Sequence, residues 1–240
     1  MITYDHISIP EATQLQLEMR KQINIKPFEK KIQTIGGADL SFNKLSNTVY
    51  AGIVILSYPE MELLSYSLIE METTFPYVAG YLAFREVPSL LRAWEQLPEK
   101  PDVLILDGQG ITHPRKMGIA SHFGVLEKQP TIGCAKSMMF GKFDDLGLEK
   151  NSSSPILGKI ESGAELLGYA LRTKNAVKPI YISPGNLITV EESLEVIRDC
   201  VGRYRIPEPT RVAHDVVNLF RLGKLKAGYH LHKDSQETLF

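Results

Sequence analysis

The spacing of apolar and polar positions predicts strands in the first third of the chain, followed by strands and helices in alternation. Residues 11–23 carry apolar side chains at helical spacing after Pro10, which predicts an opening helix. Three segments rich in β-branched and aromatic residues then follow, joined by short polar connections typical of hairpins. The predicted strands are Ile32–Phe42, Thr48–Ser57 and Glu62–Met71.

The rest of the chain predicts a sheet that is covered by helices. Val103–Leu106 is a continuous apolar run, typical of a strand buried on both faces. Further strands are predicted at Thr131–Ala135, 156–161, 166–173 and Lys178–Ser183, and further helices at 87–97, 190–201 and 207–222. This order of elements predicts the α/β class, with a central mixed sheet flanked by helices.

Length and composition favour one soluble domain over residues 1–240, with a basic and loose C-terminal tail at about 223–240. No apolar run reaches the roughly 18 residues of a membrane span. The first residues lack the basic and apolar regions of a signal peptide. Two cysteines are too few for a disulfide framework. We therefore expect a cytoplasmic monomer that does not bind membranes.

Charge is nearly balanced, with 27 Lys and Arg against 28 Asp and Glu. Its distribution is uneven, because residues 198–234 hold eight basic and four acidic side chains. In the predicted last helix, Arg211, His214, Asn218 and Arg221 form one polar stripe. The stripe is either a solvated face or a surface for a phosphate backbone, and charge alone does not decide between them.

Candidate chemistry gathers where predicted strands end. Asp107 follows the buried strand and opens the segment DGQGITHPR, while Lys136 follows another strand. Asp39 lies within the first strand and Glu86 lies beside a helix start. Singly, these acids are explained by a turn, a solvated strand or a helix end. Together, the three would form an all-oxygen site suited to Mg²⁺ or Mn²⁺.

Four segments resemble those of the endonuclease V family, the deoxyinosine-specific repair nucleases, and occur in the same order. They are PYVAGYLAFRE (76–86), DGQGITHPR (107–115), GCAKS (133–137) and IPEPTRVAH (206–214). The resemblance extends from about Gly36 to His214 and implies an RNase H-like fold. It implies a metal-dependent endonuclease that recognises hypoxanthine in nucleic acid during DNA repair. Cleavage would fall at the second phosphodiester 3′ to the lesion, leaving a 3′-OH and a 5′-phosphate.

The resemblance also implies roles for individual residues. Asp39, Glu86 and Asp107 would form the acidic site for Mg²⁺, with Mn²⁺ as a substitute, and Lys136 and His214 would complete the catalytic set. The substrate-binding residues would be Pro76, Tyr77 and Val78 of a strand-separating wedge, Gly80, Gly108 and Gly110 of a pocket for the extruded base, and His113. Two positions depart from the family pattern: Ala79 stands where the wedge commonly ends in proline, and Gln109 stands where histidine is frequent.

Two alternatives remain open from the sequence. The first is a nuclease of the same fold whose main substrate is inosine in RNA, since contacts to a 2′-hydroxyl are not visible in a sequence. The second is a non-catalytic nucleic-acid-binding module. The expected partner is DNA containing deoxyinosine, with inosine-containing RNA as the second possibility.

Overall fold

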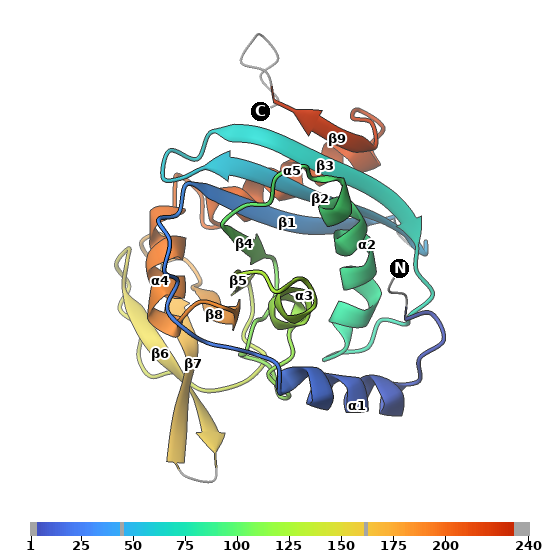
Figure 1. Cartoon of the computed structure of the whole chain (residues 1–240). Coiled ribbons are helices and arrows are strands. Elements are labelled where there is room, and N and C mark those ends of the chain that lie inside the picture. The colour runs from blue at the N-terminus through green and yellow to red at the C-terminus, as the bar shows by residue number, and fades with distance from the viewer. Residues whose placement is uncertain (1–3, 44–45, 161–162, 233–240) are drawn as a thin grey trace.

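The structure is a computed structural model that describes residues 4–43, 46–160 and 163–232. Within these ranges, nine strands form one sheet in the order β6-β7-β8-β5-β4-β1-β2-β3-β9 (Figure 1). The strands are β1 (Thr34–Phe42), β2 (Thr48–Ser57), β3 (Leu63–Glu72), β4 (Val103–Leu106), β5 (Thr131–Ala135), β6 (Ser153–Ile160), β7 (Gly163–Leu171), β8 (Ile180–Asn186) and β9 (Gly228–Leu231). The helices of the same ranges are α1 (Ile9–Arg20), α2 (Leu82–Gln96), α3 (Ile119–Glu127), α4 (Val190–Asp199) and α5 (Glu208–Arg221).

The sheet is mixed. Strands β1, β4 and β5 are parallel neighbours, and the remaining pairs are antiparallel. The carboxyl ends of the three parallel strands therefore meet at one edge, where ligands of α/β proteins collect. The predicted α/β class, a central mixed sheet flanked by helices, is confirmed, in keeping with the RNase H-like arrangement that the resemblance implies.

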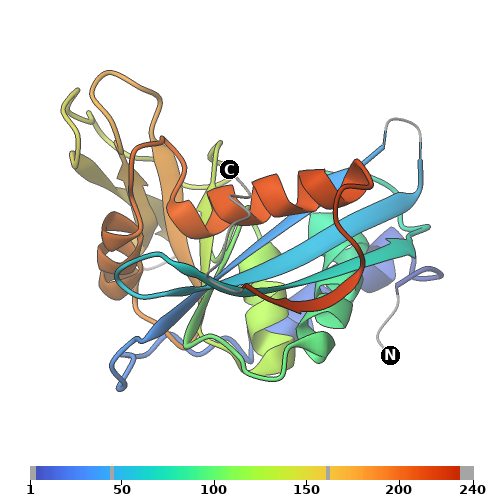
Figure 2. The same ribbon diagram turned by 90° about the horizontal axis from the view of Figure 1, so that it is seen from above.

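Helices cover both faces of the sheet and enclose two apolar cores. Helices α2 and α3 pack on one face, over a core that includes Leu90, Trp94 and Phe123. Helices α4 and α5 pack on the other face, where Ile197 of α4 and Val216 of α5 contribute to the second apolar core. Figure 2 shows α5 lying across the strands on the face opposite α2 and α3. No helix of the described residues is long and apolar enough to cross a membrane.

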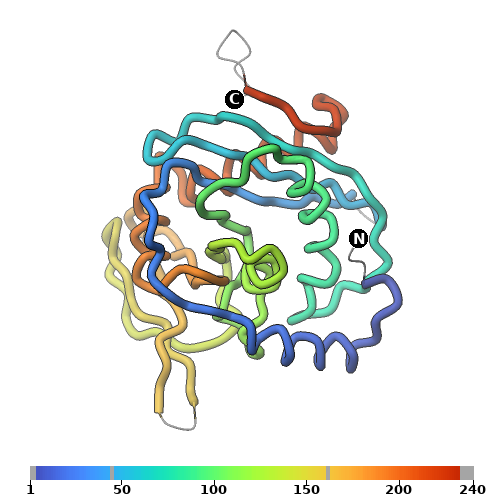
Figure 3. The backbone as a smooth tube through the Cα atoms, viewed as in Figure 1, coloured from blue at the N-terminus to red at the C-terminus, as the bar shows by residue number. Residues whose placement is uncertain are grey.

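The backbone trace shows two peripheral features (Figure 3). Helix α1 lies outside the two helices of its face and packs against α3. The β6–β7 hairpin projects away from the rest of the chain. Helix α1 borders the functional site described below.

Three predictions about elements need correction. Helix α2 begins at Leu82 rather than at residue 87, so Glu86 lies inside the helix. Helix α3 was not predicted, because it is buried on nearly every side and shows no polar face to mark its period. The tail after Gly223 is not loose throughout, because Gly228–Leu231 forms a strand that pairs with β3. Residues 233–240 of the tail lie outside the described residues.

Candidate active site

Two of the predicted carboxylates lie side by side on adjacent parallel strands. The register aligns Ala38 of β1 with Leu106 of β4, so the next residues, Asp39 and Asp107, are neighbours. The Asp107 amide donates to the Ala38 carbonyl at 3.4 Å. Asp39 is buried, with 7% of its surface exposed. The topology thus brings together two acids that are far apart in the sequence.

Each of these carboxylates has a basic partner from a different element. Lys136, directly after β5, forms an ion pair with Asp107. His214 of α5 lies with its Nδ1 2.8 Å from an oxygen of Asp39. Burial alone would lower the pKa of Lys136, but the nearby Asp107 carboxylate raises it overall. The hydrogen bond to Asp39 raises the pKa of His214. Both partners therefore favour their protonated forms at this edge.

The approach of α5 that delivers His214 depends on Gly37 of β1. A Cβ on Gly37 would lie 1.9 Å from the carbonyl oxygen of Pro209, in the first turn of α5. No side chain fits in that space, so the helix backbone packs directly on the strand. His214 in turn contacts Asn218 one turn later, at 2.9 Å from Nε2. The polar stripe of α5 therefore faces the site at His214 and Asn218.

Glu86 reaches the same region from the opposite face of the sheet. It is buried in α2, and this burial, with the charges of Asp39 and Asp107, raises its pKa to about 8. Burial also raises the pKa of Asp107, against the opposing effect of Lys136. A cluster of mutually repelling, desolvated carboxylates favours either protons or a cation.

The donor set fits a hard divalent cation, although the side chains do not form a ready-made cage. In the described parts of the chain, no three His, Cys, Asp or Glu side chains are grouped so as to hold a metal ion. One oxygen of Asp107 and one of Asp39 instead bond to Lys136 and His214. The three carboxylates would supply oxygen ligands and negative charge of the kind that a hard divalent cation such as Mg²⁺ or Mn²⁺ prefers.

A cavity of about 250 Å³ opens beside Asp107 and Lys136. It lies between the start of α2, the segment after β4, the start of α3 and the segment after β5. Its lining is mainly apolar and comprises Tyr77, Gly80, Leu82, Ala83, Asp107, Gly108, Gln109, His113, Met117, Gly118, Ile119, Ala135, Lys136, Ser137 and Met139. This volume is below the ~300–1,000 Å³ of pockets for drug-sized ligands, so the cavity suits a group about as large as one base.

Of the three predicted pocket glycines, Gly80 and Gly108 line the cavity and Gly110 does not. A Cβ on Gly110 would lie 2.1 Å from the carbonyl oxygen of Pro184 in β8. The Gly110 amide donates to the hydroxyl of Ser183 at 3.0 Å. Gly110 therefore allows the loop after β4 to pack against β8, behind the cavity.

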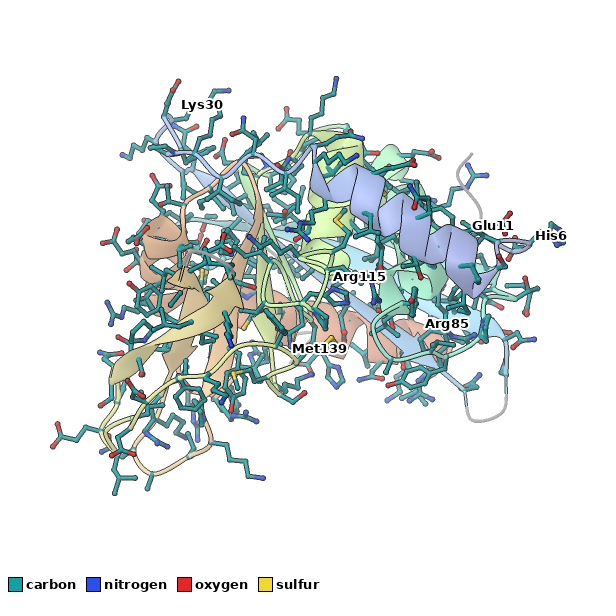
Figure 4. The ribbon with its side chains drawn as sticks, turned by 90° about the horizontal axis from the view of Figure 1, so that it is seen from below. His6, Glu11, Lys30, Arg85, Arg115 and Met139 are labelled. Carbon is teal, nitrogen blue, oxygen red and sulfur yellow. The ribbon has the colours of Figure 1, made fainter. Side chains whose placement is uncertain are left out.

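The carbonyl of Gly80, at the cavity wall, receives three hydrogen bonds. The donors are Gln16 Nε2 at 3.0 Å, Arg115 Nη2 at 2.9 Å and His113 Nε2 at 3.1 Å. Gln16 is fully buried and also accepts from Arg115 Nε at 2.5 Å. Figure 4 shows Arg115 near α1, and Met139 in the loop that follows β5. Helix α1 thus braces one wall of the cavity.

His113 belongs to the same network as the Arg115 guanidinium. Its Nδ1 accepts from the backbone amides of Arg115 and Met117 at 3.1 and 3.3 Å, so Nε2 carries the proton that it donates to Gly80. Burial lowers the pKa of His113 to about 4. At neutral pH it is therefore an uncharged donor that faces the cavity.

The predicted wedge stands at the mouth of the cavity. Tyr77 is 79% exposed and lines the opening, and Pro76 beside it is exposed. Val78 accepts from the Tyr81 amide at 3.0 Å, closing a turn before α2. Arg85 holds the start of the segment by donating to the Phe75 carbonyl at 2.6 Å. A fixed base and an exposed ring at the tip are suited to insertion between nucleotides.

Sequence reasoning missed Gln16 and Arg115 as site residues. Gln16 lies between Ala12 and Met19 on the buried stripe of α1. A polar residue in an otherwise apolar stripe must find partners when buried, and that exception was the available signal. Arg115 lay within a quoted segment but had no evident role, since its partners Gln16 and Gly80 are far away in the sequence.

Carboxylates paired with a lysine, at the sheet edge beside a base-sized cavity, are an arrangement suited to an α/β enzyme that cleaves phosphodiester bonds. Comparison with known proteins agrees. The family model for Endonuclease V matches residues 17–215. Endonuclease V of Trichormus variabilis is 39% identical over 208 residues, covering 86% of this chain and 92% of the relative. The chain belongs to the endonuclease V family and is an endonuclease.

Solved structures show the same similarity. The endonuclease V of Streptomyces avermitilis superposes with a TM-score of 0.83 at 33% identity, covering 90% of this chain and 94% of that chain. The endonuclease V of Ciona intestinalis, in complex with a DNA that contains an inosine followed by a ribo-adenosine, gives 0.79 at 28% identity, with 91% and 99% covered. The assignment to an endonuclease argues against the non-catalytic alternative.

Proposed function

We propose that this endonuclease recognises hypoxanthine in DNA and hydrolyses the second phosphodiester on its 3′ side, in DNA repair. The observation that supports this most directly is the base-sized cavity beside the Asp107–Lys136 pair. A base held in this cavity would place the adjoining nucleotides of its strand near Asp107 and the other carboxylates. The Ciona relative, whose complex contains inosine in DNA, supports the same substrate class.

Recognition requires the base to leave the helix stack. Inosine pairs weakly, which lowers the cost of extruding it. Tyr77 would fill the resulting gap by stacking on the remaining bases. In the cavity, hypoxanthine presents an O6 acceptor and an N1–H donor to backbone and side-chain groups, whereas adenine presents the reverse pattern. The neutral His113 and the close walls at Gly80 and Gly108 would limit which bases fit.

Hydrolysis would take place at the carboxylate edge. Asp39, Asp107 and Glu86 would hold Mg²⁺, or Mn²⁺ in its place, and a divalent ion at such a site acidifies the attacking water and stabilises the leaving 3′-oxygen. The ammonium of Lys136 would stabilise charge that develops on the phosphoryl group. His214 would hold the Asp39 carboxylate through the contact at Nδ1, while Asn218 contacts Nε2.

A second candidate substrate is inosine in RNA. It is favoured by the ribo-adenosine that follows inosine in the DNA of the Ciona complex. A ribonucleotide at this position would place its 2′-hydroxyl next to its own 3′-oxygen, which is the leaving oxygen of the bond proposed to be cleaved.

The test is cleavage of matched strands that contain one inosine, as DNA and as RNA, with Mg²⁺ or with EDTA. We expect a cut at the second phosphodiester 3′ to inosine in Mg²⁺, no cut in EDTA, and no cut when adenine replaces hypoxanthine. Sizing the product against a ladder gives the position, and the ratio of rates gives the preferred sugar. Cleavage that persists in EDTA, or that ignores the base, would refute the proposal.

A further inference from the structure

We propose that Tyr204 and Arg203, in the loop between α4 and α5, form a stacking platform for a base on the 3′ side of the cleaved bond. The inference rests on the proposed function, since it concerns the path of the same strand beyond the catalytic edge. It assigns a role to a part of the basic C-terminal region that the catalytic site does not use.

Exposed aromatic rings are rare in this molecule. Among the Phe, Tyr and Trp residues that the structure describes, only Tyr77 and Tyr204 are exposed, at 79% and 50%. Tyr77 stands at the mouth of the base cavity, where the wedge role accounts for it. Tyr204 lies outside that cavity, and its ring contacts the guanidinium groups of Arg203 and Arg211. An exposed ring beside cationic side chains is the usual means of binding single-stranded nucleic acid.

The loop is tied directly to the catalytic lysine. Arg205, the residue after Tyr204, donates to the carbonyl of Lys136 at 3.3 Å. It also donates to the carbonyls of Pro179 at 2.7 Å and Lys178 at 2.8 Å. These bonds hold the loop beside the strand end from which Lys136 projects. The exposed ring is therefore placed by the same backbone that places the catalytic ammonium.

The ring is also held from the side of α5. The Arg211 guanidinium lies 5.1 Å from the ring centre of Tyr204, and it is itself fixed by ion pairs with Glu208 and Asp215. Arg211 precedes His214 by one turn of the same helix. Arg203 lies 5.9 Å from the ring centre and is exposed. Arg211 would orient the ring, while Arg203 would be available to a phosphate.

The direction of the strand follows from the two faces of the sheet. The base cavity lies on the side of α2 and α3, whereas Tyr204 packs with α5 on the other face. Asp107 and Lys136 lie at the edge between them. Because the proposed cut is 3′ to the extruded base, a strand that passes from the cavity over this edge reaches Tyr204 with its 3′ portion.

The test measures the affinity of single DNA strands in EDTA, so that binding is observed without cleavage. One strand contains a deoxyinosine and normal bases throughout. A second lacks the bases 3′ of the scissile bond but keeps the phosphates, and a third lacks the bases 5′ of inosine. The variants are Tyr204→Ala, Tyr204→Phe, which keeps the ring, and Leu148→Ala, which removes an exposed apolar side chain elsewhere.

We expect Tyr204→Ala to weaken binding of the first and third strands by roughly 5- to 150-fold, the range for one lost base–aromatic stack. On the second strand, the affinity of Tyr204→Ala should equal that of the unsubstituted protein, because this strand has no base that could stack on Tyr204. Tyr204→Phe and Leu148→Ala should bind all three strands normally.

Equal losses on all strands, or a loss that disappears only when the 5′ bases are missing, would overturn the inference. So would unchanged affinity of Tyr204→Ala on the first strand. The proposed function fails separately, if the unsubstituted protein does not cut inosine strands in Mg²⁺. The affinity differences can still be measured in that case.

Discussion

At the carboxyl edge of the sheet, Asp107, Lys136, Asp39 and His214 interact as charged or proton-sharing groups. At the cavity wall, Gln16, His113 and Arg115 converge on the backbone carbonyl of Gly80. The first region depends on charge, and the second depends on the position of the backbone. Under the proposed function, the edge carries out the chemistry and the cavity recognises the base, so we expect a change of charge at the edge to affect the rate and a change of shape at the cavity to affect selectivity.

The histidines of the two regions report the same contrast. His214 at the edge has a raised pKa because of its hydrogen bond to Asp39. His113 at the cavity has a pKa lowered by burial to about 4, and His122, which is fully buried in α3, has one lowered by burial to about 3. A histidine at the edge is therefore more readily protonated than the two histidines on the side of the cavity.

The largest expected effect is at the edge. Asp107→Asn keeps the shape of the side chain but removes its charge, so the cation site weakens and Lys136 loses its ion partner. We expect cleavage of an inosine strand in Mg²⁺ to fall by roughly 10³-fold or more, with little change in melting temperature. The exposed Asp145→Asn serves as the charge-matched control. A variant that still cuts at near the normal rate would show that Asp107 is not a ligand.

The next effect tests whether Gly110 belongs to recognition or to packing. Since a Cβ there would meet the Pro184 carbonyl at 2.1 Å, Gly110→Ala should destabilise the fold by about 1–3 kcal/mol. Thermal unfolding and single-turnover cleavage of inosine and abasic strands measure it. We expect a lower melting temperature and similar losses on both strands. An unchanged melting temperature, with a loss of cleavage on the inosine strand alone, would show instead that Gly110 contributes to base recognition.

A smaller effect sharpens the recognition side. Gln16→Leu removes a donor to Gly80 and leaves Arg115 Nε without its acceptor. We expect cleavage of inosine to fall roughly 10-fold, from a cost of about 1–3 kcal/mol for an unpaired buried group. An abasic strand, which has no base to position, should be affected less. Gln14→Leu on the same helix is the control, because Gln14 is exposed and its side chain bonds to Glu18, away from Gly80 and Arg115. Equal losses on both strands would indicate a general loosening instead.

The smallest effect concerns acid. The buried His122, with its Nε2 2.8 Å from the Tyr4 hydroxyl, has a pKa of about 3, below the ordinary value of about 6.5 in the unfolded chain. Below pH 6.5 the unfolded state binds the extra proton, so the free energy of unfolding falls as pH falls towards about 3.

His122→Asn removes this titration and should flatten the acid side of the stability curve, by about 1 kcal/mol at pH 6 relative to pH 8. Urea unfolding at several pH values measures the difference. The stability of His122→Asn at pH 8 provides the baseline, since any packing defect appears there as well. Parallel curves for the two proteins would mean that His122 is not the group involved.

The sheet could be predicted largely from the sequence because its signals are local. Val103–Leu106 and Thr131–Ala135 are strands as expected, since an apolar run ended by Asp107 or Lys136 marks both the strand and its end. Helix α3 could not be predicted in this way, because burial on nearly every side removes the polar face that reveals a helix. The four-residue β9 depends on pairing with β3 and has little pattern of its own.

The site was predictable to the extent that the resemblance named its residues. The structure brings together Asp39, Asp107, Lys136 and His214. Glu86 lies close enough to Asp39 and Asp107 for their charges to raise the pKa of Glu86. The hydrogen bonds of Gln16 to Gly80 and Arg115 could not be predicted from the sequence, because they join α1 to residues 64 and 99 positions away. Such contacts exist only once the sheet and helices are assembled.

Strand β9 has a consequence for solubility. An edge strand with unpaired amides and carbonyls is a template for aggregation. The edge of β3, ten residues long, pairs with β9 over Ser65–Leu68, and Tyr66 stacks on His230 with ring centres 4.9 Å apart. His232 extends the cover by donating to the Leu64 carbonyl. The last described segment thus acts as a cap that leaves little of the central part of that edge open to another chain.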